Sequence, residues 1–321
     1  MKIFYTDHFV LPLPDGHRFP MRKYSDLRSR VAAADWLRPG MLLEPVAADD
    51  AQIALAHDTD YVRRVSTGSL DARQIRAIGF PWSPQMVERS RRSAGATVAA
   101  CRAALDEGCG INLAGGTHHA FRDRGEGYCV FNDAAIAALT MRREGRIERV
   151  AIVDCDVHQG NGTASILARE PALFTFSIHG ARNFPFSKER SDIDVELPDA
   201  TGDAEYLAAL ADGLAATFAM SRPQLAIYLA GADPFADDRL GRLSLSKAGL
   251  TERDRMVLDA CDRAGVPVAI AMAGGYARDI ADTVDIHFAT VTLAAERYAG
   301  RATTMARAGP ASSASPGEPA I

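Results

Sequence analysis

The sequence predicts a single-domain α/β protein, in which a mainly parallel central sheet carries helices on both faces. Short runs of apolar, often β-branched residues alternate with longer segments of helical periodicity, which is the order that joins parallel strands through crossover helices. The runs are apolar at successive positions, as expected of strands buried on both faces. The expected strands are residues 2–5, 110–114, 150–153, 173–179, 225–230 and 266–272.

The first third of the chain is expected to alternate loops and helices after an opening strand. Residues 2–5 contain three β-forming side chains, whereas the prolines in residues 11–20 exclude regular structure. A helix is expected over residues 25–36, ended by a Pro-Gly pair, and residues 57–62 have the pattern of a turn that enters a helix. A Ser-Pro pair, which favours a helix start, opens a long helix over residues 84–107.

The middle of the chain repeats the alternation of strand and helix. Strand 110–114 is apolar and is followed by a loop, after which helix 133–144 returns the chain to strand 150–153. Past that strand, Thr163 is expected to cap a short helix at residues 164–167.

The C-terminal half continues in the same way after strand 173–179. Residues 183–202 are polar and lack periodicity, so a loop is expected there. Helices are expected over residues 205–220, 251–263 and 279–298, interleaved with the last two strands. Residues 301–321 are rich in Ala, Ser, Pro and Gly, and a disordered tail is expected.

Composition places the chain among soluble intracellular proteins. The net charge is −5 without a basic stripe, which argues against nucleic acid as a partner. The five cysteines form no C-x-x-C pair, which argues against a thiolate zinc site and against a disulfide framework and suits a reducing cytoplasm. The N-terminus lacks a signal-peptide pattern, and no apolar run reaches membrane-spanning length. High alanine and arginine content favours a bacterial source.

Asp154, Asp156 and His158 are the side chains around which a site is expected. They occupy alternate positions directly after the apolar run 150–153, so in extended chain they point the same way. Two carboxylates and an imidazole at a strand end are typical ligands of a divalent metal. Taken alone, the group is also compatible with a solvated acidic turn.

Three other expected strands end in polar or glycine-bearing groups. His118 and His119 follow one strand, Asp233 follows another, and Gly274, Gly275 and Tyr276 follow the last. In parallel sheets, ligands bind outside the carboxyl ends of the strands. The coincidence of these groups at equivalent positions predicts a metal-dependent active site.

The residue types suit hydrolysis assisted by a metal ion. Asp156, His158 and Asp233 would leave coordination positions open, and the set suits Zn²⁺ or Fe²⁺. Adjacent imidazoles can accept and return a proton. Asp154 is better placed behind a histidine or a monovalent cation, and Tyr276 can donate a hydrogen bond to a developing oxyanion. The combination predicts amide hydrolysis without a serine or cysteine nucleophile.

The ordered set of motifs resembles the histone deacetylase family. The resemblance covers most of the chain, from about residue 57 to about residue 298. It includes a further segment, residues 127–133, and the stretches 158–162 and 237–241 are similar to class IV members and their bacterial relatives. This resemblance implies the arginase/deacetylase fold and a catalytic domain over residues 1–300.

The resemblance also implies roles for individual residues. Asp156, His158 and Asp233 would hold the catalytic metal. His119 would act as general base and acid, with His118 as its electrostatic partner and Asp154 behind His118. Tyr276 would polarise the substrate carbonyl.

The resemblance implies a second ion and a substrate channel as well. A structural K⁺ would lie near Asp154 and Ser177, and backbone carbonyls would complete its site. The full potassium set is Asp154, Asp156, His158, Ser177 and Ile178. The expected substrate-contacting residues are Gly127, Tyr128, Gly274 and Gly275, and Phe184 and Phe186 are candidates for the channel wall.

The chain departs from the family pattern at three places. Asn161 stands where class I enzymes place an aspartate behind the second histidine, so His119 should be less basic. Ala273 replaces one glycine of the run before Tyr276. Residues 80–84 show no counterpart of the acidic residue with which class I enzymes hold their substrate.

The sequence is compatible with several functional hypotheses. The preferred substrate is an acetylated or longer acylated lysine of a peptide or protein, and small acylated amines such as acetylpolyamines are the alternative. A ureohydrolase would need a second aspartate where Phe235 stands. A non-catalytic acyl-lysine binding module would be expected to lack Tyr276 or a metal ligand. The residues do not distinguish acyl chain length, native metal or oligomeric state.

Overall fold

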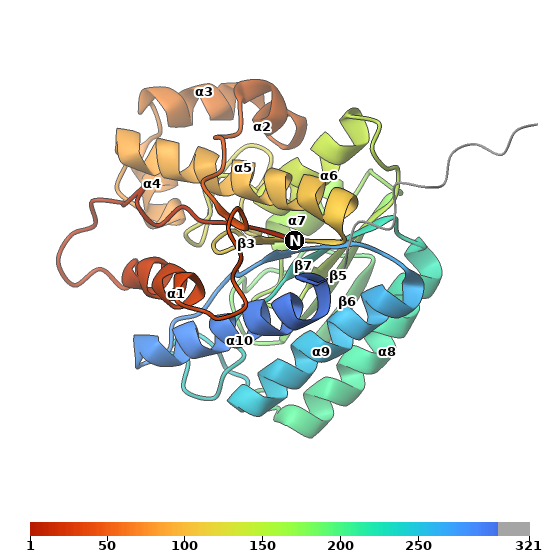
Figure 1. The fold of residues 1–321 in the computed structure, drawn as a ribbon. Helices are drawn as coiled ribbons and strands as arrows, with labels where there is room; N and C mark the ends of the chain where they lie inside the picture. The colour runs from red at the N-terminus through yellow and green to blue at the C-terminus, as the bar shows by residue number, and fades with distance from the viewer. Residues whose placement is uncertain (301–321) are drawn as a thin grey trace, which may run out of the picture.

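A single eight-stranded parallel sheet forms the centre of the molecule, with helices on both of its faces (Figure 1). The computed structural model describes residues 1–300, so the predicted disordered tail at 301–321 lies outside the described residues. The strand order is β2-β1-β3-β8-β7-β4-β5-β6. The strands are β1 (Lys2–Phe4), β2 (Leu42–Leu43), β3 (Cys109–Asn112), β4 (Val150–Asp154), β5 (Leu173–Gly180), β6 (Ile193–Leu197), β7 (Leu225–Leu229) and β8 (Val268–Ala271). The predicted fold class is confirmed.

The helices form two layers. In Figure 1, α2 to α7 lie on one side of the sheet and α1, α8, α9 and α10 on the other. The helices are α1 (Arg22–Ala32), α2 (Asp50–Ala56), α3 (Thr59–Thr67), α4 (Ala72–Ile78), α5 (Pro84–Glu107), α6 (Asp133–Arg143), α7 (Asn161–Leu167), α8 (Asp203–Ser221), α9 (Lys247–Ala264) and α10 (Ile280–Tyr298).

The central strands are buried on both faces, which explains why their sequences are apolar without alternation. In β4, Val150 and Ile152 belong to the core shared with α5 and α6. Ala151 and Val153 belong to the opposite core, shared with α8, α9 and α10. Each central strand therefore contributes to two apolar layers, and the polar residues of the site can only follow the strand ends.

Most predicted boundaries agree with the structure, and the helix caps explain several of them. Helix α5 begins at Pro84 as predicted, with the Ser83 side chain accepting from the backbone N–H of Met86. Helix α9 begins at Lys247, four residues earlier than predicted, because the side chain of Ser246 caps it. Helix α1 also begins and ends earlier than predicted, at Arg22 and Ala32.

Two predictions about local structure are wrong. Thr163 does not cap α7, because the helix already begins at Asn161 and Thr163 lies within it. Residues 183–202 are not entirely loop, because β6 pairs there with β5 at one edge of the sheet. An edge strand is half exposed, and its mixed sequence does not show the continuous apolar run that identified the central strands.

The short elements α2, α4 and β2 were not expected from the sequence. Both helices are stabilised at their N-termini by capping boxes, Asp49 with Gln52 and Asp71 with Gln74. Over residues 1–300, the structure contains no helix with both the length and the apolar character that a membrane span requires.

Candidate active site

The side chains expected to form a site follow four strands that are neighbours in the sheet. The strands β3, β8, β7 and β4 are adjacent at its centre, and all are parallel. Their carboxyl ends border a cavity of about 700 Å³. The predicted site residues that line this cavity are His118, His119, Gly127, Tyr128, Asp156, His158, Asp233, Gly274 and Tyr276.

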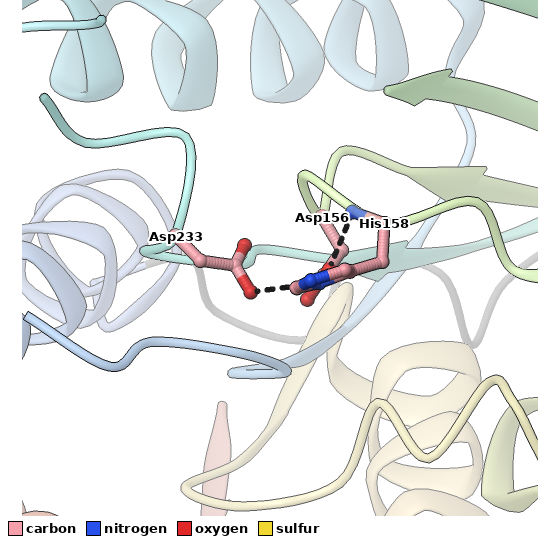
Figure 2. A group of neighbouring side chains, drawn as sticks. All are labelled: Asp156, His158 and Asp233. Carbon is pink, nitrogen blue, oxygen red and sulfur yellow. Dashed lines mark hydrogen bonds and ion pairs between the residues drawn. The ribbon is translucent and has the colours of Figure 1, made fainter. Parts of the chain in front are cut away.

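Asp156, His158 and Asp233 form a buried group that could hold a metal ion. Their potential ligand atoms all lie within 4.8 Å of one another. The Nδ1 atom of His158 is 2.9 Å from Oδ1 of Asp156 and 3.4 Å from Oδ2 of Asp233. Figure 2 shows the three side chains pointing toward one another. That Asp233 oxygen is buried and has no hydrogen-bond partner among residues 1–300. Two carboxylates, an imidazole and an oxygen without a hydrogen bond fit a divalent cation.

Gly274 leaves the space that this group needs. Its N–H donates to Oδ2 of Asp156 at 2.8 Å. A Cβ atom at Gly274 would lie 1.9 Å from Oδ2 of Asp233 and 2.6 Å from Oδ2 of Asp156. Any larger residue at this position would therefore force the two carboxylates or the Gly274 loop to shift.

The two adjacent histidines have different partners, and this gives them different electrostatic properties. Nδ1 of His118 donates to Oδ2 of Asp154 at 2.6 Å, and Nδ1 of His119 donates to Oδ1 of Asn161 at 2.7 Å. Burial opposes a charge on His118, but the carboxylates of Asp154 and Asp156 outweigh it and raise the pKa of His118 to about 9. Burial, together with the neighbouring His118 and His158, holds the pKa of His119 well below its usual value. His119 is thus the neutral imidazole, with Nε2 available as an acceptor.

The loop that carries the histidines is anchored by Asn132 and Asp133, at the start of α6. The Asp133 carboxylate accepts from the N–H of Gly116 at 3.0 Å and of Thr117 at 2.7 Å. The Asn132 amide donates to the carbonyl oxygens of His118 at 3.3 Å and Ala120 at 3.1 Å. The Asn-Asp pair of the motif at residues 127–133 therefore holds the histidine loop in place.

His57 supports the same loop from behind. Its Nδ1 donates to the carbonyl oxygen of Phe121 at 2.8 Å, and its Nε2 accepts from the N–H of Asn132 at 2.9 Å. Both ring nitrogens are therefore used in the neutral form. Burial lowers the pKa of His57 from 6.5 to about 4.

This burial predicts a loss of stability in mild acid. Between pH 6.5 and pH 4, His57 binds a proton in the unfolded chain but stays neutral in the folded protein. The contribution of His57 to the free energy of unfolding is complete above pH 6.5 and falls by up to about 3 kcal/mol as the pH drops toward 4. Urea unfolding at several pH values should show a shallower acid dependence for His57→Gln than for the wild type. Equal slopes in the two proteins would refute this account.

Arg253 of α9 fixes the two turns that carry the metal-binding carboxylates. It is fully buried, and its Nη1 donates to the carbonyl oxygens of Cys155 and Gly231. Its Nε and Nη2 donate to Oδ1 of Asp254 at 2.9 and 2.7 Å. Cys155 directly precedes Asp156, and Gly231 stands two residues before Asp233, so one guanidinium spans both turns.

Removing this guanidinium should destabilise the protein strongly. Arg253→Leu would leave Asp254 buried without its cation, and losing one partner of a buried ion pair costs about 3–5 kcal/mol. Urea unfolding of Arg253→Leu should show this loss. Arg255→Leu, on the exposed side of the same helix, should unfold within about 0.5 kcal/mol of the wild type. A small effect for Arg253→Leu would show that the turns are held by other contacts.

The Tyr276 loop is fixed by Asp238, Arg239 and Lys23. The Tyr276 N–H donates to Oδ2 of Asp238 at 2.6 Å, and its carbonyl oxygen accepts from Nε of Arg239 at 3.1 Å. The Lys23 ammonium donates to the carbonyl oxygens of Ala273 at 3.4 Å and Gly275 at 3.3 Å, and lies 5.2 Å from the centre of the Tyr276 ring. Burial raises the pKa of Tyr276 well above its usual value, so it remains a hydroxyl donor.

Aromatic side chains form the wall of the cavity. The Phe184 ring packs edge-on against His119, with centroids 4.9 Å apart, and the Tyr128 and Tyr276 rings are 6.1 Å apart. Phe184 and Phe186 both line the cavity, but Phe186 is 87% exposed and stands at its mouth. Gly275 is not among the residues of the described chain that line the cavity. Its backbone φ of 151° suits a glycine in the turn before Tyr276.

The remaining predicted site residues lie behind the cavity. Asp154 and Ser177 are directly opposite each other on the adjacent strands β4 and β5, and Ile178 follows in β5. Asp154 accepts from His118 and from the N–H of Asp156. The potassium site formed by this set stays a prediction.

The sequence interpretation missed the basic residues of the cavity. Lys23, Arg76, Arg182, Arg239 and Arg242 all line it. They come from α1, α4 and two loops, and none stands in a recognisable spacing with the groups at the strand ends. Only Arg239 could have been singled out from the sequence, because it lies inside the segment 237–241 that resembles class IV members.

The fold and these side chains define a class of protein, the hydrolases of the arginase/deacetylase fold. The chain belongs to the histone deacetylase family, because the sequence profile of the Histone deacetylase domain matches residues 17–291. The predicted family is thus confirmed.

Three curated relatives illustrate the similarity. An uncharacterized protein of Picosynechococcus sp. is 42% identical over 89% of this chain and 95% of its own length. Histone deacetylase 2 of Arabidopsis thaliana is 29% identical over 84% of this chain and 73% of its own. A histone deacetylase-like amidohydrolase of Pseudomonas aeruginosa is 29% identical over 71% and 64%, respectively.

Solved structures show the same fold. The crystal structure of an HDAC homolog from Aquifex aeolicus superposes with a TM-score of 0.80 and 23% identity, over 94% of this chain and 84% of that one. An HDAC homolog complexed with SAHA gives the same values. The HDA15 HD domain gives a TM-score of 0.76 at 20% identity, over 91% and 90%.

Proposed function

We propose that this protein removes acetyl or longer acyl groups from acyl-lysine side chains by metal-assisted hydrolysis. The observation that carries the proposal is the convergence of two groups in one cavity. The first group, Asp156, His158 and Asp233, can hold a cation. The second group, His118, His119 and Tyr276, can move a proton and stabilise an oxyanion. Family membership supports the same reaction type.

The ligand set favours Zn²⁺, with Fe²⁺ as the alternative. A divalent ion held by the three ligands would lower the pKa of a water molecule and polarise the amide carbonyl. A structural K⁺ beside Asp154 and Ser177 belongs to the same proposal. We further assign the protein to the class IV-like, bacterial and cytoplasmic enzymes. The five cysteines of residues 1–300 are all buried, which suits a reducing compartment.

The proton transfers fall to the histidine pair. His119 accepts a proton from the attacking water at Nε2, because Asn161 holds the proton on Nδ1. His119 then returns the proton to the leaving lysine nitrogen. His118, paired with Asp154, remains charged and stabilises the developing negative charge. The Tyr276 hydroxyl donates a hydrogen bond to the same oxyanion. The walls formed by Phe184 and Tyr128 exclude water from the acyl group.

The test is hydrolysis of a matched pair of fluorogenic lysine peptides, one acetylated and one carrying a long acyl chain. The protein is reconstituted with Zn²⁺ or Fe²⁺, and an acetylated polyamine is assayed alongside. Preference for one acyl-lysine would support the proposal and measure the depth of the channel.

The two alternatives give different results in this assay. Activity on the polyamine alone would favour a deacetylase of small acylated amines. Binding of metal and peptide without turnover would favour an acyl-lysine binding module.

A further inference from the structure

Four arginines surround the mouth of the cavity. Arg76 lies in the last turn of α4, Arg182 follows β5, and Arg239 and Arg242 lie in the loop after β7. All four are exposed. The chain as a whole carries a net charge of −5, so this concentration of positive charge does not reflect its average composition.

Carboxylates do not balance these arginines. Arg182 and Arg242 share one carboxylate, Asp199, at 3.9 and 3.1 Å. Among residues 1–300, neither Arg76 nor Arg239 forms an ion pair with a carboxylate. The acidic residues that line the cavity within residues 1–300 are Asp156 and Asp233, and both lie in the metal-binding group. The mouth therefore carries an excess of positive charge.

Structural roles account for only part of this arrangement. Arg76 is favourable at the C-terminal end of α4 because of the helix dipole, and Arg239 uses its Nε to hold the Tyr276 carbonyl oxygen. A guanidinium has five N–H donors in a fixed fork, so the Nη groups of Arg239 remain for a ligand. The helix end that carries Arg76 is also fixed to the cavity wall. The carbonyl oxygens of the two residues after Arg76 accept from the N–H groups of Gly127 and Tyr128.

We propose that the molecule bearing the acylated amine also has a carboxylate, which binds to the four arginines at the mouth of the cavity. Guanidinium groups bind carboxylates through paired hydrogen bonds, and the excess charge would attract anions and repel polycations. The proposal rests on the proposed function and specifies its substrate class. The carboxylate can come from acidic residues beside an acyl-lysine or from the α-carboxylate of a free acylated amino acid. Acetylated polyamines, which are polycations, are disfavoured.

The test compares substrates that differ only in charge. Acetyl-lysine peptides of one length, flanked by Asp, Ala or Lys, are assayed with the metal-loaded protein. Nε-acetyl-lysine is compared with its C-terminal amide, which lacks the carboxylate. We expect kcat/KM to fall at least about tenfold from the Asp to the Lys peptide at low salt, and this difference to shrink at high salt. A larger effect of amidation than of the flanking residues would identify the free amino acid as the source.

A double variant, Arg76→Glu with Arg182→Glu, should reverse the order of the Asp and Lys peptides. Arg73→Glu is the matched control, because Arg73 is an exposed residue of α4 that does not line the cavity. Equal or faster hydrolysis of the Lys peptide by the wild type, or an order unaffected by the double variant, would overturn the proposal.

Binding of the same peptides, labelled and measured by fluorescence anisotropy, separates this inference from the proposed function. If no peptide were hydrolysed but the Asp peptide bound most tightly, the proposed function would fail and the charge preference would stand. If the peptides were hydrolysed without any charge preference in either measurement, only the inference would fail.

Discussion

Replacing Tyr276 with phenylalanine is expected to lower kcat by about 100- to 1,000-fold, the usual cost of losing one oxyanion donor. Tyr276 lines the cavity on a loop held by Asp238, Arg239 and Lys23, so the ring should keep its place in the variant. Because no contact of Tyr276 holds the metal-binding residues, the metal content should not change. The measurements are steady-state kinetics on the preferred acyl-lysine peptide and metal analysis of the purified protein.

Tyr24→Phe is the matched control. Tyr24 also lines the cavity and lies beside Lys23, but no role is proposed for its hydroxyl. Its removal should change kcat by no more than a few fold, a smaller effect than loss of a transition-state hydrogen bond. Wild-type turnover in Tyr276→Phe would remove the tyrosine from the mechanism. Loss of metal in the same variant would show that it supports the metal group instead.

The central sheet and the strand-end groups could be predicted because a buried parallel sheet restricts its sequence strongly. Strands covered on both faces must be apolar, so any polar residue directly after them stands out. Asp154, Asp156 and His158 were found in this way. That β3, β8, β7 and β4 are adjacent was not evident from the local sequence, since β8 pairs with a strand more than 150 residues earlier in the chain. Their adjacency is a property of the whole sheet.

The supporting and mouth residues could not be predicted, because their roles depend on distant segments. Lys23 belongs to an ordinary amphipathic helix, and only the folded chain brings it to the carbonyl oxygens of Ala273 and Gly275. Arg253 also looks like a surface residue in the sequence, although it is fully buried. Charged residues are normally exposed, so sequence reasoning assigns them to the surface unless a motif marks them.

Gly274→Ala should weaken metal binding without removing a single ligand. The added Cβ would lie 1.9 Å from Oδ2 of Asp233, so the carboxylate must move or the loop must shift. Changes that reorient a ligand typically cost 10- to 100-fold in metal affinity, and we expect a loss of about that size. The measurement is a competition titration with a chromophoric chelator, and circular dichroism checks that the fold persists. Activity should recover partly when excess metal is added.

The neighbouring residue provides the control. Ala273 has a φ of 54°, a conformation that glycine adopts more easily than alanine. Ala273→Gly therefore changes the same loop by one methyl group in the opposite direction and places nothing near the carboxylates, so its metal affinity should stay close to that of the wild type. Equal losses in both variants would point to loop flexibility as the cause. A normal metal affinity in Gly274→Ala would show that the loop can shift away from the carboxylates. The close contact of Gly274 with Asp156 and Asp233 would then not be needed to form the metal site.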